Sequence, residues 1–187
     1  ASMDWNAYEE LEHAQKGVGA GRIELWMQYD AQGQRVRKAV EHYVGDGEGG
    51  ETLAWVEEWL YLGGYELHRK HAGGSVSEAV LRETQTLHVA DGEHRVAIVE
   101  VRTVNEGTSG GVMLDEGDRV VRERWQLGNH LGSAAVEVDG DGELVTYEEF
   151  HPYGSCAMLY KRAGTDDEPK RYRFTGMERD ETGLQYH

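Results

Sequence analysis

Apolar and polar side chains alternate with a period of two between residues 22 and 29. One parity is apolar throughout, and the other is mostly polar. A period of two is typical of a strand that has one face better buried than the other. The sequence therefore predicts a strand over 22–29, whose apolar parity consists of Ile23, Leu25, Met27 and Tyr29.

The residues that follow this strand have the chemistry of a tight turn. Asp30 can accept a hydrogen bond from a backbone N–H two residues further on, and Gly33 can adopt a positive φ without steric cost. Residues 35–44 then resume as a strand, in which Val36, Val40 and Val44 share one parity. The sequence thus predicts a hairpin whose turn is Asp30 to Gly33.

The same arrangement, in which a turn with Asp and Gly joins two strands, recurs twice. Asp91-Gly92 lies between predicted strands over 84–89 and 96–101, and Asp-Gly is a strong hairpin signal. Asp139 to Gly142 lies between predicted strands over 134–138 and 143–150. Hairpins of this kind cannot bury their faces alone, so neighbouring hairpins must stack. The predicted fold class is mainly β, an antiparallel array of hairpins that forms a curved sheet.

Two segments leave an alternative open. Residues 7–15 contain good helix formers, and Leu53, Val56 and Leu60 have helical spacing, so each segment could be a short helix. The residues Trp5 to Leu11 can also be aligned with the turn above, with Glu9 where glycine is expected. Loops are expected at four stretches rich in glycine or short polar residues: 45–50, 72–77, 105–111 and 163–169.

Composition and charge narrow the classes of protein. The chain has 25 Gly and only 2 Pro in 187 residues, which suits many short strands joined by turns. Its formal net charge of −16 argues against a nucleic-acid partner, because phosphate binding relies on clustered Lys and Arg. No apolar run is long enough to span a membrane, so we expect no membrane insertion by this chain.

The candidate chemical groups favour structural roles. The single Cys156 excludes an internal disulfide framework and is expected to be a small buried or half-buried residue. Asp139 to Glu143 fails the spacing of a calcium loop. His68 and His71 would face opposite sides of a strand, and Ser155 has no nucleophile-and-base arrangement around it. We therefore predict no catalytic residue, no metal site and no cofactor, and hence no enzyme.

The last third of the chain carries a more specific pattern. It contains Trp125-Gln-Leu-Gly-Asn-His-Leu-Gly-Ser133, then Tyr147-Glu-Glu-Phe-His-Pro-Tyr-Gly154, and then Arg171-Tyr-Arg-Phe-Thr-Gly-Met-Glu-Arg-Asp. Together with Tyr29-Asp-Ala-Gln-Gly33, these motifs resemble Rhs/YD-repeat proteins, which include the shells of bacterial polymorphic toxins and the C component of Tc toxins. The matching positions are Tyr29, Asp30, Gly33, Asn129, His130, Leu131, Gly132, Pro152, Tyr153, Gly154, Thr175, Gly176, Glu178, Arg179, Asp180, Thr182, Gly183 and Leu184.

This resemblance implies an organisation and a function. It divides one continuous domain into an N-terminal segment over 1–21, YD-repeat-like hairpins over 22–124 and a core-associated region over 125–187. In this family, hairpins wind into a hollow shell that encloses a toxic C-terminal domain. The implied function is a structural part of an exported toxin shell, whose partners are neighbouring shell repeats and the enclosed toxin domain. The alternative is an extracellular YD-repeat module for binding or adhesion.

Two expectations follow from what the 187 residues contain. The family's aspartyl autoprotease motif and variable toxin domain are absent from them, so we expect no autoproteolysis and no toxicity of this chain by itself. We also expect unpaired sheet edges, which invite self-association. Trp125, Tyr172 or Phe174 should lie near that contact.

Overall fold

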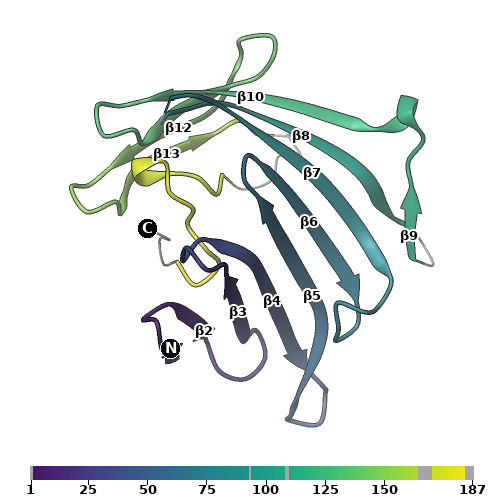
Figure 1. Cartoon of the computed structure of the whole chain (residues 1–187). Coiled ribbons are helices and arrows are strands. Elements are labelled where there is room, and N and C mark those ends of the chain that lie inside the picture. Colours follow the sequence, from purple (N-terminus) through teal and green to yellow (C-terminus); the bar gives the residue numbers. More distant parts are fainter. Residues whose placement is uncertain (1, 93, 108–109, 164–169, 184–187) are drawn as a thin grey trace. The chain divides into compact units, whose positions relative to one another are not determined.

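The computed structural model describes residues 2–92, 94–107, 110–163 and 170–183. They form thirteen strands and two single 3-10 turns, and every pairing with a described register is antiparallel (Figure 1). The predicted mainly β, antiparallel fold class is confirmed. The strands are β1 (Ser2–Trp5), β2 (Leu11–Lys16), β3 (Ile23–Tyr29), β4 (Arg35–Gly45), β5 (Glu51–Leu62), β6 (Tyr65–Ala72), β7 (Val80–Asp91), β8 (His94–Gly107), β9 (Gly110–Met113), β10 (Val120–Gly128), β11 (Ala134–Val138), β12 (Leu144–Phe150) and β13 (Cys156–Lys161). The 3-10 turns are η1 (Glu116–Asp118) and η2 (Phe174–Gly176).

The chain divides into two compact units. The first comprises residues 1–86 and 101–120, and the second comprises 87–100 and 121–187. In the first unit the strands pair in chain order from β1 to β8, and β9 pairs with β8. In the second unit the order continues from β7 and β8 to β10, β11, β12 and β13. Each unit is therefore built from strands that pair with their neighbours in sequence.

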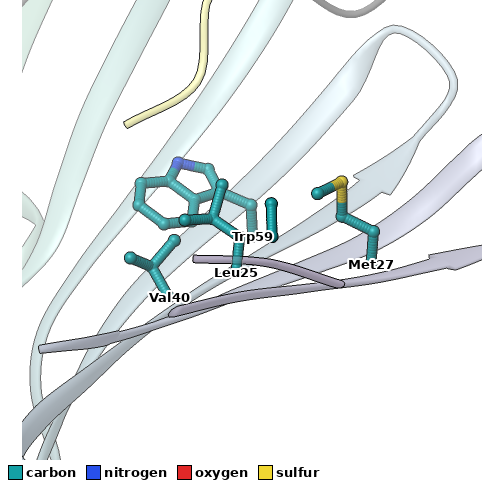
Figure 2. Packing of buried hydrophobic residues seen from close by; sticks show 5 residues of the cluster. Leu25, Met27, Val40 and Trp59 are labelled. Carbon is teal, nitrogen blue, oxygen red and sulfur yellow. The ribbon is translucent and has the colours of Figure 1, made fainter. Parts of the chain in front are cut away.

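The apolar core of the first unit lies on one face of strands β2 to β5. The register places Leu25 opposite Val40 and Lys38 opposite Trp59, so side chains of one parity on each strand share this face. Lys38 is fully buried here, with its ammonium 4.1 Å from the Trp59 ring centroid, so a cation–π contact accompanies its burial. The core residues are Ala14, Leu25, Met27, Val40 and Trp59, four of which are labelled in Figure 2.

The hairpin predictions are confirmed in detail. The predicted strand over 22–29 is β3, with Leu25 and Met27 buried and Trp26 exposed. Gly33 and Gly142 have positive φ, +75° and +80°. Gly92, with φ of +62°, lies between β7 and β8 as expected, while its neighbour Glu93 is outside the described residues.

The helical alternatives are wrong. Residues 11–16 form β2 and residues 51–62 form β5. The spacing of Val56 and Leu60 reflects one parity of a strand, since Trp55, Glu57 and Trp59 form the other. Apolar residues occur at both parities of β5, and this conceals the period of two.

Two smaller expectations are also corrected. Residues 105–107 and 110–111 are strand, because β8 continues to Gly107 and pairs there with Gly110 of β9. Cys156 is exposed because the side chains of β13 are exposed on both faces. The loop predicted over 163–169 lies almost wholly outside the described residues.

Candidate functional site

A five-residue turn recurs between the strands of both units. Its first residue has an Asp or Asn side chain that accepts two backbone N–H groups, and its fourth residue has positive φ. At Asp30 these donors are the N–H groups of Gln32 and Gln34, at 2.9 and 3.0 Å. The Gly33 N–H also donates to the Asp30 carbonyl, at 3.1 Å. This arrangement is a type I turn followed by a left-handed residue, a common three-residue hairpin loop.

The same side-chain hydrogen bonds occur at four further positions, three of which also have glycine at the fourth place. The exception is the turn at Asn6, where Glu9 has φ of 65°. The remaining first residues are Asp46, Asn129 and Asp139. His151 begins a turn with the same backbone bonds and with positive φ at Gly154. Only a loop was predicted over 45–50, although Asp-Gly-Glu-Gly over 46–49 has the spacing of this turn.

These turns contain many of the residues that the family resemblance selects. Asp30 and Gly33 occupy the turn after β3, while the Tyr29 hydroxyl donates to the Leu11 carbonyl at 2.8 Å. Asn129, His130, Leu131 and Gly132 form the turn after β10. Pro152, Tyr153 and Gly154 form the turn after β12, and Tyr153 is almost fully exposed. Leu184 lies outside the described residues.

The segment over residues 170–183 lies against β11 and the turn before it. The Ser133 hydroxyl accepts the Thr175 N–H at 2.9 Å, and the Ala134 N–H donates to the Arg173 carbonyl at 3.0 Å. A Cβ on Gly176 would lie 3.4 Å from the Gly132 carbonyl oxygen. The motifs around Gly132 and Thr175, distant in sequence, therefore make a close backbone contact in which a larger side chain would be crowded.

A buried carboxylate on β12 anchors the same segment. Glu148 has a side chain with no exposed surface, and the Arg173 guanidinium forms a two-pronged contact with it. The Lys170 ammonium lies 3.7 Å from the same carboxylate, is itself buried, and donates to the Ala134 carbonyl. Burial lowers the pKa of Lys170, and the nearby charge of Arg124 acts in the same direction. We call Glu148, Lys170 and Arg173 the latch.

A second buried carboxylate lies on the neighbouring strand. Glu137 accepts the Gln126 amide at 2.9 Å and the Thr146 hydroxyl at 2.7 Å, so both of its oxygens are hydrogen-bonded. Buried carboxylates need such partners, because desolvation of an unpaired charge is expensive. β10, β11 and β12 are thus joined by polar side chains as well as by backbone bonds.

The remaining residues that match the family motifs make contacts within residues 170–183. The same segment also contacts β8. Glu178 is buried and accepts from Arg171 at 3.0 Å, and the Arg179 N–H donates to the Arg171 carbonyl at 2.8 Å. The guanidinium of Arg95, on β8, lies 3.7 Å from the Tyr172 ring centroid. Asp180 caps a last turn by accepting from the Thr182 and Gly183 N–H groups at 3.0 and 3.1 Å.

In the first unit, Glu57 of β5 is a carboxylate with two histidine partners. It lies 2.8 Å from Nε2 of His42 and 3.3 Å from Nε2 of His68. Burial acts to raise the pKa of Glu57, but the hydrogen bonds from both histidines outweigh it and hold that pKa well below its usual value. His42 stacks on Trp55 and His68 on Trp59, at centroid distances of 4.7 and 4.1 Å.

These groups have the geometry of structural contacts. His71 faces away from His68, with Nδ1 3.2 Å from the Glu78 carbonyl, so the two do not converge on one point. Within the described ranges, no group of three or more His, Cys, Asp or Glu side chains is placed to hold a metal ion. The same part of the chain contains no helix with the length and hydropathy needed to cross a bilayer.

Two known toxin subunits are similar in sequence to all or most of this chain. The toxin subunit YenC1 of Yersinia entomophaga is 32% identical over 190 residues, which cover 100% of this chain and 18% of the relative. The toxin subunit YenC2 of the same organism is 33% identical over 160 residues, which cover 85% of this chain and 14% of the relative. The chain thus spans less than a fifth of these relatives. No family model matches it.

Solved structures of Tc toxin components are also similar to this chain. A crystal structure of TcdB2-TccC3 without its hypervariable C-terminal region aligns with 98% of this chain and 8% of its own, with a TM-score of 0.72 and 27% identity. The Photorhabdus luminescens Tc holotoxin pore aligns with 99% of this chain and 8% of its own, with a TM-score of 0.73 and 26% identity. The chain is therefore homologous to a segment of the Tc toxin subunits YenC1 and YenC2, and it is a region of the Rhs type that is similar to the C component of Tc toxins.

Proposed function

We propose that this chain is part of a shell that encloses a toxic domain and takes part in its delivery, within an exported protein. The observation that carries this proposal is the homology of the whole chain to toxin subunits. Neighbouring shell repeats and an enclosed toxin domain are the proposed partners. Since the chain spans 18% of YenC1, it would supply one portion of such a wall.

The repeated turn supports a wall-forming role. The same hydrogen-bonded turn joins several consecutive strands, among them β3 to β4 and β11 to β12, so a further hairpin can pair with the previous strand without a new kind of connection. A hairpin array grows by this addition, and each repeat contacts mainly its neighbours. We assign residues 22–124 to this hairpin portion and 1–21 to a diverged repeat, because Glu9 replaces the turn glycine.

The latch supports a distinct role for residues 125–187. A segment without regular strands is fixed on β11 and β12 by the buried contacts of Glu148. Such contacts hold an irregular segment in one place, because withdrawing Arg173 leaves the unexposed Glu148 carboxylate with Lys170 as its remaining cation. We propose that this core-associated region fastens the chain that follows the repeats onto the wall.

A chimera would test the enclosing role. The 187 residues would replace the matching region of YenC1, and limited proteolysis would measure how fast the C-terminal domain of the chimera is cleaved. We expect cleavage at the rate seen in YenC1, and faster cleavage when Glu148→Leu removes the latch carboxylate. Glu149→Gln, on the adjacent exposed position of β12, is the matched control.

Two outcomes would contradict the proposal. A folded chimera whose C-terminal domain is cleaved as fast as the isolated domain has no enclosing wall. If the 187-residue chain then also binds cell surfaces, the adhesion module becomes the better interpretation.

A further inference from the structure

We propose that His71 is a proton-dependent clasp, which fixes the connection between β6 and β7 when its ring carries a proton on both nitrogens. His71 is the last residue but one of β6, and only 2% of it is exposed. Its Nδ1 lies 3.2 Å from the carbonyl oxygen of Glu78, in the connection that leads to β7. Its Nε2 lies 3.7 Å from Oε2 of Glu58 on β5. Each nitrogen of the buried ring therefore faces an oxygen atom.

The Glu78 carbonyl selects the tautomer of the neutral ring. A carbonyl oxygen can only accept a hydrogen bond, so Nδ1 must carry the proton that it donates. Nε2 of the neutral ring then has a lone pair, and this lone pair faces the carboxylate of Glu58. Among the described residues, Nε2 has no hydrogen-bond partner. A second proton on Nε2 converts this unfavourable contact into an attraction between opposite charges.

Carboxylates outnumber guanidinium groups around the ring. The register places Glu41 of β4 two strands away from His71, on the same face of the sheet. Burial by itself disfavours a charged imidazole, and this excess of negative charge opposes that effect. Arg82 of β7 contacts Glu57 on the opposite face, so it does not restore the balance. The charged groups near the ring are Arg37 and Glu41 of β4, Glu58 of β5, Arg69 of β6, Glu78 of the connection and Glu83 of β7.

The protonated ring completes a series of polar contacts across β4, β5, β6 and the connection. Arg37 Nε donates to Oε1 of Glu58 at 2.6 Å, and Oε2 of the same carboxylate faces the ring. Nδ1 of the ring then donates to the connection. A backbone bond holds the same connection, since the Ala72 N–H donates to the Ala79 carbonyl at 2.9 Å. The persistence of that backbone bond should therefore follow the protonation of Nε2.

The direction of the pH effect follows from the Glu58 contact. The protonated ring gains the attraction to this carboxylate and the neutral ring lacks it, so the contribution is present at low pH and is lost as the pH rises. Histidine side chains change their charge between about pH 5 and pH 8. The connection between β6 and β7 should therefore be held more firmly near pH 5 than near pH 8.

Nuclear magnetic resonance of the imidazole nitrogens tests the tautomer on the unaltered 187-residue chain. At about pH 8 we expect His71 to carry its single proton on Nδ1, and at about pH 5 to carry a proton on both nitrogens. A proton on Nε2 alone in the neutral ring would overturn the proposal. So would a ring that stays neutral at the acid end of the series.

Hydrogen exchange of the Ala72 N–H tests the clasp. The protection factor, which is corrected for the intrinsic pH dependence of exchange, should be about threefold to tenfold higher near pH 5 than near pH 8. Glu58→Gln keeps the shape of the side chain and removes its charge, so this pH dependence should disappear. His71→Asn keeps a donor near the place of Nδ1 and lacks the second ring nitrogen, so it should also lose the pH dependence.

The control is His130→Asn, at an exposed position in the turn after β10, which should keep the wild-type pH dependence. An unchanged pH dependence in Glu58→Gln or His71→Asn would overturn the proposal, as would protection in the wild type that rises with pH. The tautomer measurement needs no variant, so the failure of one variant to fold leaves the proposal open to refutation.

Discussion

Glu9 and Gly33 occupy the same position of the repeated turn, and both have positive φ, 65° and 75°. A residue with a Cβ pays about 1–2 kcal/mol in the left-handed region, whereas glycine does not. The turn at Asn6 nevertheless has all the hydrogen bonds of the turn at Asp30. The side-chain acceptor and the flanking strands are therefore sufficient to hold Glu9 in this conformation.

Reciprocal substitutions should measure this strain. Gly33→Glu is expected to lower the free energy of unfolding by about 1–2 kcal/mol, and by somewhat more if Glu10 Oε1, 3.2 Å from the new Cβ, cannot move. Glu9→Gly should change stability by less than about 0.5 kcal/mol, because strain relief is offset by the greater freedom of the unfolded chain. Urea denaturation of both variants is the measurement.

Gly142→Val separates strain from crowding. Nothing lies within 4 Å of the position that a Cβ would take at Gly142, and its φ is +80°. A loss of about 1–3 kcal/mol is expected from conformation alone. A loss near zero would show that the turn relaxes to another form and would contradict the strain attributed to Glu9.

The acceptor at the start of the turn should be replaceable by asparagine and not by alanine. Asp30→Ala leaves the Gln32 and Gln34 N–H groups without their acceptor, at a cost of about 1 kcal/mol. Asp30→Asn retains an oxygen in the same place, as Asn6 and Asn129 show in their own turns. Thermal unfolding should therefore rank the asparagine variant close to the wild type, and a similar loss in both variants would assign the effect to charge.

The sequence predicted those parts of the fold that depend on neighbours along the chain. The turn at Asp30 to Gly33 needs an acceptor and a glycine at fixed spacing, and both are visible in the sequence. β5 was ambiguous, because its stability depends on partners from other strands. Glu57 lies between His42 of β4 and His68 of β6, and no local pattern around Glu57 indicates either histidine.

The latch was not predictable for the same physical reason. Glu148 belongs to a Tyr-Glu-Glu-Phe run in which both glutamates look alike, and only the fold buries one of them and exposes the other. Its partner Arg173 is 25 residues away in sequence. The family motif indicated that residues around Arg173 matter, while their contact with Glu148 required the register of β12.

Acid should weaken the first unit through Glu57. The hydrogen bonds from His42 and His68 outweigh burial and lower the pKa of Glu57 in the folded chain from an ordinary value of 4.5. A lowered folded pKa stabilises the protein above the unfolded pKa, and this contribution is lost as pH falls toward the folded pKa. The free energy of unfolding should therefore decrease as the pH is lowered below about 4.5.

Glu57→Gln should make that acid dependence shallower. The variant is expected to lose stability at pH 7 and to approach the wild type as pH decreases toward 2. Glu48→Gln, at an exposed position in the turn after β4, is the control and should keep the wild-type slope. Denaturant titrations at several pH values make the comparison. Identical slopes in the wild type and Glu57→Gln would assign the acid dependence to other carboxylates.

The latch should behave as a coupled pair in a double-mutant cycle. Arg173→Met leaves the unexposed Glu148 with Lys170 as its remaining cation, so a loss of about 2–4 kcal/mol is expected. Glu148→Leu alone should cost a similar amount, because the buried Lys170 and the partly buried Arg173 then lack this carboxylate. The combined variant removes the carboxylate together with one cation and should lose at least about 1 kcal/mol less than the sum of the single losses.

Hydrogen exchange of the Thr175 N–H, which donates to the Ser133 hydroxyl, reports whether the segment has detached. Additive losses with unchanged exchange at Thr175 would mean that the backbone contacts around Gly132 hold the segment without the buried charges.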